Sequence, residues 1–171
     1  MAIKINQGSQ GLQRRLLSVL TSFVVIATFV ACDGNVVYKK YQDIPDNVWA
    51  RDFSPEFEFE IEDTEESYNL DLMIRNASFY PYNNIWVFIH QTDPNGLLDV
   101  DTLEIKLADE AGKWLGDGMG DLWDNKVPWK INYHFEKSGK YSYRVEHAMR
   151  TEKVPGILDL GLSVEKQELK K

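Results

Sequence analysis

The chain has 171 residues, and its 19 Lys and Arg against 27 Asp and Glu give a formal net charge of −8. Such an acidic chain is not a nucleic-acid binder, which needs a basic patch to replace the counterions of phosphates. With 43% hydrophobic and 27% charged residues, the composition fits one globular domain with an adequate core, rather than a disordered chain or a bundle of membrane spans.

The first 31 residues have the pattern of a bacterial lipoprotein signal peptide. Arg14 and Arg15 precede an apolar run from Leu16 to Val30 that holds no charged residue. This run is shorter than the roughly 20 residues that a spanning helix needs, and acidic sequence follows it at once. We therefore predict that residues 1–31 form a signal-peptide helix, and not a permanent transmembrane anchor.

The only cysteine in the sequence lies directly after this run. Phe29-Val30-Ala31-Cys32 resembles a bacterial lipobox, so Cys32 is predicted to be the lipidated first residue of the mature protein. It would carry a thioether-linked diacylglycerol and an N-linked acyl chain such as palmitate, which together hold a protein stably at a lipid bilayer. A free or buried cysteine after an ordinary signal peptide is the alternative. Residues 32–35 are interpreted as the lipidated cysteine and a short tether.

The mature chain is more acidic than the whole chain. Residues 1–31 contain three of the 19 basic residues and no acidic one, so the remainder has a formal charge of 16 − 27 = −11. Anionic lipid headgroups repel such a domain. We expect a globule held off the bilayer by its acyl anchor, rather than one that lies flat on it.

Alternation of apolar and polar residues with period two runs through the rest of the chain, and no long segment has the spacing of an amphipathic helix. In chain order, strands are predicted around residues 36–41, 56–62, 68–75, 85–89, 102–107, 131–135, 141–145 and 158–164. About eight strands at this spacing predict an all-β fold, an antiparallel β-sandwich of jelly-roll type. We place this domain at residues 36–165 and a charged tail at 166–171.

Two of the predicted strands have unusual faces. The segment Ile85 to Ile89 is apolar on both faces, as expected for a central strand covered on both sides. Glu56, Glu58, Glu60 and Glu62 line one face of their strand, where like charges destabilise it unless Lys or Arg on a neighbouring strand compensates. We interpret this row as a solvated edge that discourages aggregation, with docking to a basic partner as the alternative.

Two connections carry informative residues. Asp93-Pro94-Asn95-Gly96 predicts a tight turn between two strands. Residues 111–128 are predicted to form a long glycine-rich loop that contains Asp117, Asp121 and Asp124. Oxygen ligands on such a segment suit Ca²⁺, but their spacing is not that of an EF-hand, so a solvated loop is the expectation.

No catalytic motif is recognisable in the sequence. It has no G-x-S-x-G elbow, and His90, His134 and His147 do not have the spacing of a zinc-binding H-E-x-x-H motif. Pairs of carboxylates suited to glycoside hydrolysis arise by chance in so acidic a chain. We therefore expect no enzymatic activity, no metal ion and no cofactor.

The segment from Gly112 to Asp124 is the predicted partner-binding loop, because aromatic residues and Met are enriched at interface hot spots. Its candidate contact residues are Trp114, Leu115, Met119, Leu122 and Trp123. Arg75 and the segment from Tyr80 to Asn84 are expected to have structural roles instead. A second interpretation is a stacking platform for a sugar, built from Trp114, Trp123 and Trp129.

Several segments, in their order and spacing, resemble the gliding motility lipoprotein GldH family of Bacteroidota. They are Ile74-Arg75-Asn76, Tyr80-Pro81-Tyr82-Asn83-Asn84-Ile85-Trp86-Val87-Phe88-Ile89, Gly112-Lys113-Trp114-Leu115-Gly116-Asp117-Gly118, Gly139-Lys140-Tyr141, Met149-Arg150, and Pro155-Gly156-Ile157-Leu158-Asp159-Leu160-Gly161-Leu162. Cys32, followed by Tyr38 and Trp49, also fits this family.

The resemblance implies a membrane-anchored lipoprotein of the cell envelope that takes part in gliding motility and in the associated surface-protein machinery. It implies no enzymatic centre and no cofactor. The expected partners are the lipid bilayer, through acylated Cys32, and other envelope proteins of that machinery. We therefore expect a non-catalytic scaffold or adaptor, with a carbohydrate-binding surface lipoprotein as the alternative and a hydrolase as the third possibility.

Overall fold

The structure, a computed structural model, describes residues 35–167. The predicted signal-peptide helix at 1–31, the lipidation site Cys32 and the last four residues lie outside the described residues. In the described part, no helix has the length and apolar character needed to cross a membrane. The elements are β1 (Val36–Asp43), η2 (Pro45–Asn47), β2 (Val48–Ala50), β3 (Glu56–Ile61), β4 (Tyr68–Ala77), β5 (Asn84–Thr92), β6 (Leu98–Lys106), β7 (Asp117–Met119), β8 (Leu122–Tyr133), β9 (Gly139–His147), β10 (Lys153–Pro155) and β11 (Ile157–Lys166).

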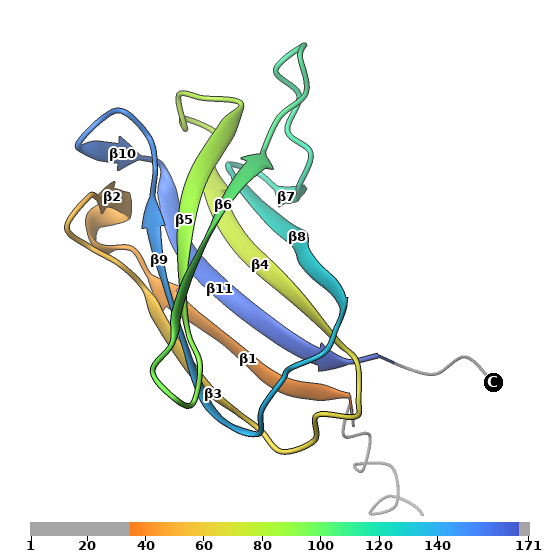
Figure 1. Cartoon of the computed structure of the whole chain (residues 1–171). Helices are drawn as coiled ribbons and strands as arrows, with labels where there is room; N and C mark the ends of the chain where they lie inside the picture. The colour runs from red at the N-terminus through yellow and green to blue at the C-terminus, as the bar shows by residue number, and fades with distance from the viewer. Residues whose placement is uncertain (1–34, 168–171) are drawn as a thin grey trace, which may run out of the picture. The chain divides into compact units, whose positions relative to one another are not determined.

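Two antiparallel sheets pack face to face (Figure 1). The larger sheet has the strand order β1-β11-β4-β8-β7 and the smaller has β3-β9-β5-β6, while β2 pairs with β10 separately. Successive long strands change sheet at every connection except β5–β6, which is the topology of a jelly roll. This confirms the predicted antiparallel sandwich of jelly-roll type. The long strands form the jelly roll, and β2, β7 and β10 are additional short strands of three residues each.

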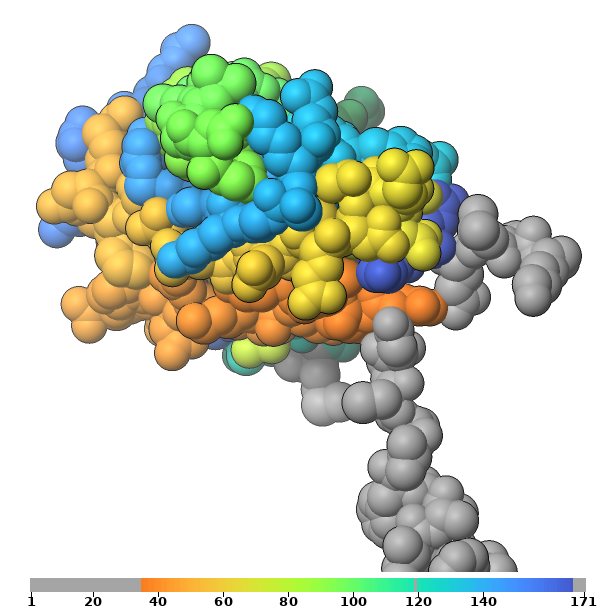
Figure 2. All heavy atoms as spheres, turned by 60° about the horizontal axis from the view of Figure 1, so that its bottom comes forward, coloured from red at the N-terminus to blue at the C-terminus, as the bar shows by residue number. Residues whose placement is uncertain are grey.

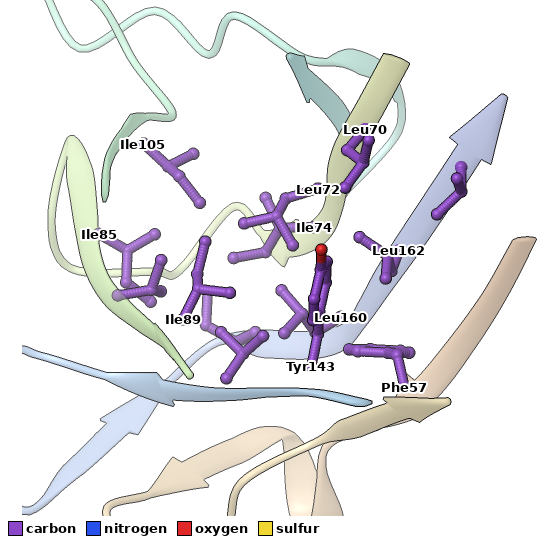
Figure 3. Packing of buried hydrophobic residues seen from close by; sticks show 14 of the residues in the cluster. Phe57, Leu70, Leu72, Ile74, Ile85, Ile89, Ile105, Tyr143, Leu160 and Leu162 are labelled. Atoms are coloured by element: carbon purple, nitrogen blue, oxygen red, sulfur yellow. The ribbon is translucent and has the colours of Figure 1, made fainter. Parts of the chain in front are cut away.

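The core lies between the two sheets and receives alternate side chains from both. Phe57, Ile85, Ile89 and Tyr143 of the smaller sheet meet Leu70, Leu72, Leu160 and Leu162 of the larger one, all buried (Figure 3). Burial of these apolar side chains is the main favourable contribution to folding.

Side chains of the neighbouring strand β9 offset part of the charge repulsion between the glutamates on β3. Phe57, Phe59 and Ile61 point into the core while the glutamates between them are exposed. Lys140 Nζ lies 2.8 Å from Glu58 Oε1, and Ser142 Oγ donates to Glu56 Oε1 at 2.6 Å. These cross-strand contacts support the interpretation of a solvated edge.

The prediction that Ile85 to Ile89 is covered on both faces is wrong. β5 pairs with β6 and β9 on its two sides, and Ile85, Val87 and Ile89 are buried, but Trp86 is 40% exposed and Phe88 39% exposed. An apolar run does not show whether anything covers its second face. Trp86 and Phe88 therefore lie on an open sheet surface.

Two bulges shift the side-chain alternation relative to the predicted strands. Asn132 has a φ of 55°, and the register between β4 and β8 slips beside it, so that Ile131 is 64% exposed while Phe135 is buried. In β11 a second register shift follows Ile157, so Ile157 and Leu160 are both buried. A bulge adds one residue to one strand and reverses which side chains point inward, which simple alternation cannot predict.

The two ends of the domain are hydrogen-bonded to each other, which corrects two predicted boundaries. Lys166 N donates to Asn35 O at 2.7 Å, so Asn35 belongs to the domain and not to a free tether. Lys166 is the last residue of β11, and Gln167 N donates to Ser67 O at 2.8 Å, so the predicted tail at 166–171 begins too early.

The sandwich has two ends, which we name by their loops (Figure 1). The tether end contains Asn35, the turn at 62–67, the β5–β6 turn at 93–97 and the connection at 134–138. The loop end contains the connections at 78–83, 107–116 and 148–152.

Candidate partner-binding surface

The predicted long loop at 111–128 is largely a β-hairpin. β7 and β8 pair through Asp117–Asp124, Gly118–Trp123 and Met119–Leu122, so only the part before Asp117 remains irregular. Four glycines and three aspartates in this stretch concealed the strands, because both residue types are rare in sheets. Position 118 requires glycine because the Trp123 side chain lies across it. A Cβ at this position would be 2.2 Å from the Trp123 ring.

The five candidate contact residues have different roles. Trp114 and Trp123 are half-buried, whereas Leu115 and Leu122 are exposed. Met119 ends β7, and its side chain lies outside the described part of the structure. The two tryptophans therefore support the loop end, while the two leucines are available to a partner.

An aromatic row joins the connections at 78–83 and 107–116 to the β7–β8 hairpin. The ring centroids of Tyr80 and Trp114 are 6.4 Å apart, as are those of Trp114 and Trp123. Trp123 Nε1 donates to Ser78 Oγ at 3.0 Å, and the buried Tyr80 hydroxyl donates to Asn84 O at 2.9 Å. Burial raises the pKa of Tyr80, which stays a neutral donor. The expected structural role of Tyr80 is thus confirmed.

The exposed stacking platform expected for a sugar does not form. Trp114 and Trp123 are tilted by 31° and half-buried. Trp129 packs edge-on against Tyr143 of the other sheet, with ring centroids 5.5 Å apart, and Lys130 Nζ lies 4.9 Å from its ring. A sugar platform needs accessible coplanar rings, which these three tryptophans do not provide.

The loop end also displays apolar side chains that we did not select from the sequence. Phe79 is 67% exposed, and Tyr82 and Trp86 are also exposed. A pocket of about 370 Å³ adjoins Tyr82 and Trp86 and is closed by the connection between β9 and β10. Its lining residues are Tyr82, Trp86, Ala148, Met149, Arg150 and Thr151. We call this the Trp86 pocket; an apolar residue in the outward phase of β5 was its only signal in the sequence.

Arg51 holds the wall of the Trp86 pocket in place. Its Nη2 donates to Met149 O at 2.9 Å and to Thr151 O at 3.1 Å, and its Nε lies 3.2 Å from Glu152 Oε1. Ala148 N donates to Trp86 O at 2.7 Å. Within the described residues Arg150 is exposed and makes no ion pair, so the pocket combines apolar walls with one available cation.

The outer face of the larger sheet differs from the Trp86 pocket because it carries ion pairs and not apolar side chains. Arg75 contacts Asp124 at 2.6 Å and Asp159 at 3.2 Å, which confirms its expected structural role. Lys126 contacts Asp71 at 3.1 Å. Burial raises the pKa of Asp159, and only Arg75 offsets that effect. The Arg75 and Lys126 side chains on this face are therefore already paired with carboxylates of the same domain.

The aspartates considered for Ca²⁺ are not arranged around an ion. Asp124 is bound to Arg75, and in the part of the chain that the structure describes no three His, Cys, Asp or Glu side chains form a group suited to a metal. His147 is buried against Trp49 with ring centroids 5.7 Å apart, and neither of its nitrogens has a hydrogen-bond partner. Burial lowers the pKa of His147.

Topology and surface together define a jelly-roll β-sandwich domain with an apolar, loop-rich end. Residues 36–164 match the family described as GldH lipoprotein, and the chain belongs to this family. Membership of a lipoprotein family supports a membrane-anchored protein of the cell envelope.

Two curated relatives are similar along most of their length. A gliding motility lipoprotein GldH homolog of Christiangramia forsetii is 33% identical over 162 residues, covering 91% of this chain and 99% of the relative. Gliding motility lipoprotein GldH of Flavobacterium johnsoniae is 29% identical over 145 residues, covering 81% and 89%. Among solved structures, a chain of the infectious bursal disease virus Gx strain matches 78% of this chain and 30% of its own length, with 9% identity and a TM-score of 0.33.

Proposed function

We propose that this chain is a non-catalytic adaptor of the gliding motility machinery, anchored in the envelope membrane through acylated Cys32. The names of its relatives from Christiangramia forsetii and Flavobacterium johnsoniae support the role in motility. The lipobox-like sequence before Cys32 supports the anchor.

The Trp86 pocket is the observation that carries the adaptor role. Trp86 and Tyr82 are residue types enriched at interface hot spots, and together with Met149 they line one pocket, so the exposed apolar surface is contiguous here and not scattered. Because Arg51 and the Trp86 backbone fix the pocket wall, a partner would not have to order it on binding. The exposed Arg150 favours a partner segment that carries an apolar side chain next to a carboxylate.

The test is crosslinking in native envelopes, followed by affinity recovery and mass spectrometry. We compare the unmodified chain with Trp86→Ser, with Cys32→Ala and with Ile131→Ser, which removes a still more exposed apolar side chain from a different surface. Losing a hot-spot contact of about 2 kcal/mol weakens binding about 30-fold.

We expect Trp86→Ser to lose crosslinks between the 148–152 connection and other envelope proteins, and Ile131→Ser to retain them. Cys32→Ala should release the chain from the membrane fraction. Crosslinks that do not change in Trp86→Ser would exclude this pocket as the interface. Recovery of polysaccharide instead of protein would favour the carbohydrate-binding alternative.

A further inference from the structure

The proposed acylation site, Cys32, precedes the tether end of the domain by only a few residues in the sequence. Asn35 is held by Lys166, and three residue steps separate it from Cys32. Three fully extended residues span at most about 11 Å. Because the headgroup layer on each side of the hydrocarbon core is about 5–7 Å thick, the tether end must lie at or near the lipid headgroups once Cys32 is acylated.

The β5–β6 turn projects two large apolar side chains from this same end. Leu97 is 68% exposed and Leu98 is 59% exposed. Figure 2, which looks toward the tether end, shows the turn in green as a bulge next to the blue 134–138 connection, while the turn at 62–67 and the start of β1 lie farther across the same end. Two exposed leucines at the tip of a turn form a compact apolar projection on the side that carries the tether.

The turn is held rigidly in this conformation. Asp93 Oδ1 accepts hydrogen bonds from Asn95 N and Leu97 N, both at 2.8 Å, and Asp93 Oδ2 lies 2.7 Å from Lys137 Nζ. These hydrogen bonds lower the pKa of Asp93, so its carboxylate remains ionised as an acceptor. Because the turn is already ordered, its contact with a second surface costs little conformational entropy.

The charges at the tether end indicate whether the β5–β6 turn would contact the lipid headgroups or the apolar layer below them. Glu62, Asp63, Glu65 and Glu66 lie in the adjoining turn, and anionic headgroups repel them. Lys137, the cation beside the leucines, is already paired with Asp93, and Lys166 lies beside Glu62 and Asp63, so the carboxylates outnumber the cations at this end. Attraction to anionic lipid therefore cannot hold this end, whereas the apolar boundary below the headgroups can accommodate Leu97 and Leu98.

We propose that Leu97 and Leu98 insert into the membrane interface as a second contact besides the acyl anchor, in place of the expected globule that is held off the bilayer. The partner of this surface is lipid, and the inference rests on the proposed acylation of Cys32. One flexible anchor leaves a domain free to rotate, whereas two separated contacts fix its orientation. The loop end with the Trp86 pocket then faces away from the bilayer.

The test uses the acylated full-length chain with Leu97→Cys, labelled with an environment-sensitive fluorophore. Acylated Cys32 has its sulfur in a thioether, so the introduced thiol is the only reactive one. Lys113→Cys, at an exposed position of the loop end outside the Trp86 pocket, is the matched control. Both proteins are reconstituted in vesicles of phosphatidylethanolamine and phosphatidylcholine, with a lipid that carries a spin label near its headgroup. Unchanged thermal unfolding shows that each labelled variant is folded.

We expect the label at residue 97 to show blue-shifted emission and quenching by the spin-labelled lipid, and the label at residue 113 to show neither. Added phosphatidylglycerol should reduce the quenching at residue 97, because the acidic turn is repelled; an increase would overturn the apolar basis of the contact. A chain that floats with the vesicles but leaves residue 97 as accessible to aqueous iodide as residue 113 would refute the insertion alone. A chain that does not float would refute the anchor and, with it, this inference.

Discussion

The indole of Trp123 lies against the backbone of Gly118, so closely that a Cβ on Gly118 would be 2.2 Å from the ring. Gly118→Ala must therefore displace Trp123 and disturb its hydrogen bond to Ser78. We expect a loss of about 1–3 kcal/mol in the free energy of unfolding, measured by urea denaturation. Gly112→Ala is the control: its φ of +81° strains an alanine, but nothing lies within 4 Å of the new Cβ. A loss in Gly118→Ala no larger than the backbone strain seen in Gly112→Ala would show that the Trp123 ring gives way at little cost in stability.

Trp114 and Leu115 are adjacent in sequence but are expected to respond differently to substitution. Trp114 packs partly against the core and lies between the rings of Tyr80 and Trp123. Trp114→Ala should therefore lower the free energy of unfolding by about 3 kcal/mol. Leu115 is exposed, so Leu115→Ala should change the stability by less than about 0.5 kcal/mol. Thermal unfolding of the two variants checks this difference. A stable Trp114→Ala protein would return this residue to the list of partner contacts.

Arg75 compensates the buried carboxylate of Asp159, whose Oδ1 has no hydrogen-bond partner. Arg75→Gln should cost about 1–3 kcal/mol at neutral pH, because a buried charge loses its partner. Burial already raises the folded-state pKa of Asp159, so the folded state binds a proton more readily than the unfolded state. The loss in the free energy of unfolding caused by Arg75→Gln should therefore decrease as the pH falls toward the folded-state pKa of Asp159.

Urea denaturation of Arg75→Gln at pH 7 and pH 4.5 measures this change. Asp159→Asn in the same background is the control, because it removes the charge and should abolish the difference between the two pH values. A cost that is equal at both pH values would mean that Asp159 is not the group left uncompensated.

His147 is expected to make the domain sensitive to acid. Burial lowers its pKa in the folded state, so below about pH 6.5 the unfolded chain takes up a proton that the folded chain excludes. Its contribution to stability is therefore complete above the unfolded-state pKa and is lost as the pH falls, by at most about 1.4 kcal/mol per pH unit. His147→Phe should reduce this slope, measured by urea denaturation between pH 5 and pH 7. His134→Gln, at an exposed position, should keep the slope of the unmodified chain; a similar reduction there would contradict the assignment to His147.

Much of the fold follows from local patterning in the sequence. β3 and β9 alternate buried and less buried residues, so period two identified the inward face of both strands, although β9 extends two residues beyond the predicted 141–145 at each end. The eight long strands then leave few arrangements that bury every apolar face, and the jelly roll is one of them.

The remaining features depend on contacts between distant residues. The bulge at Asn132 and the Gly118–Trp123 contact are properties of two strands together, so no pattern within one segment reveals them. For the same reason, the sequence identified Trp114 and Trp123 as aromatic but not as half-buried supports. Trp86 was taken for a core residue because hydropathy does not distinguish a covered face from an open one.

The pairing of β1 with β11 affects how the domain would carry mechanical load. β1 begins at Val36, shortly after the proposed acylation site Cys32, and runs from the tether end toward the loop end in antiparallel register with β11. Traction between the membrane and the loop end would act along these strands, and their hydrogen bonds lie across that direction. The whole ladder would then resist in shear, instead of opening one pair at a time. The first strand after the anchor is thus placed where it can transmit force without unzipping the sandwich.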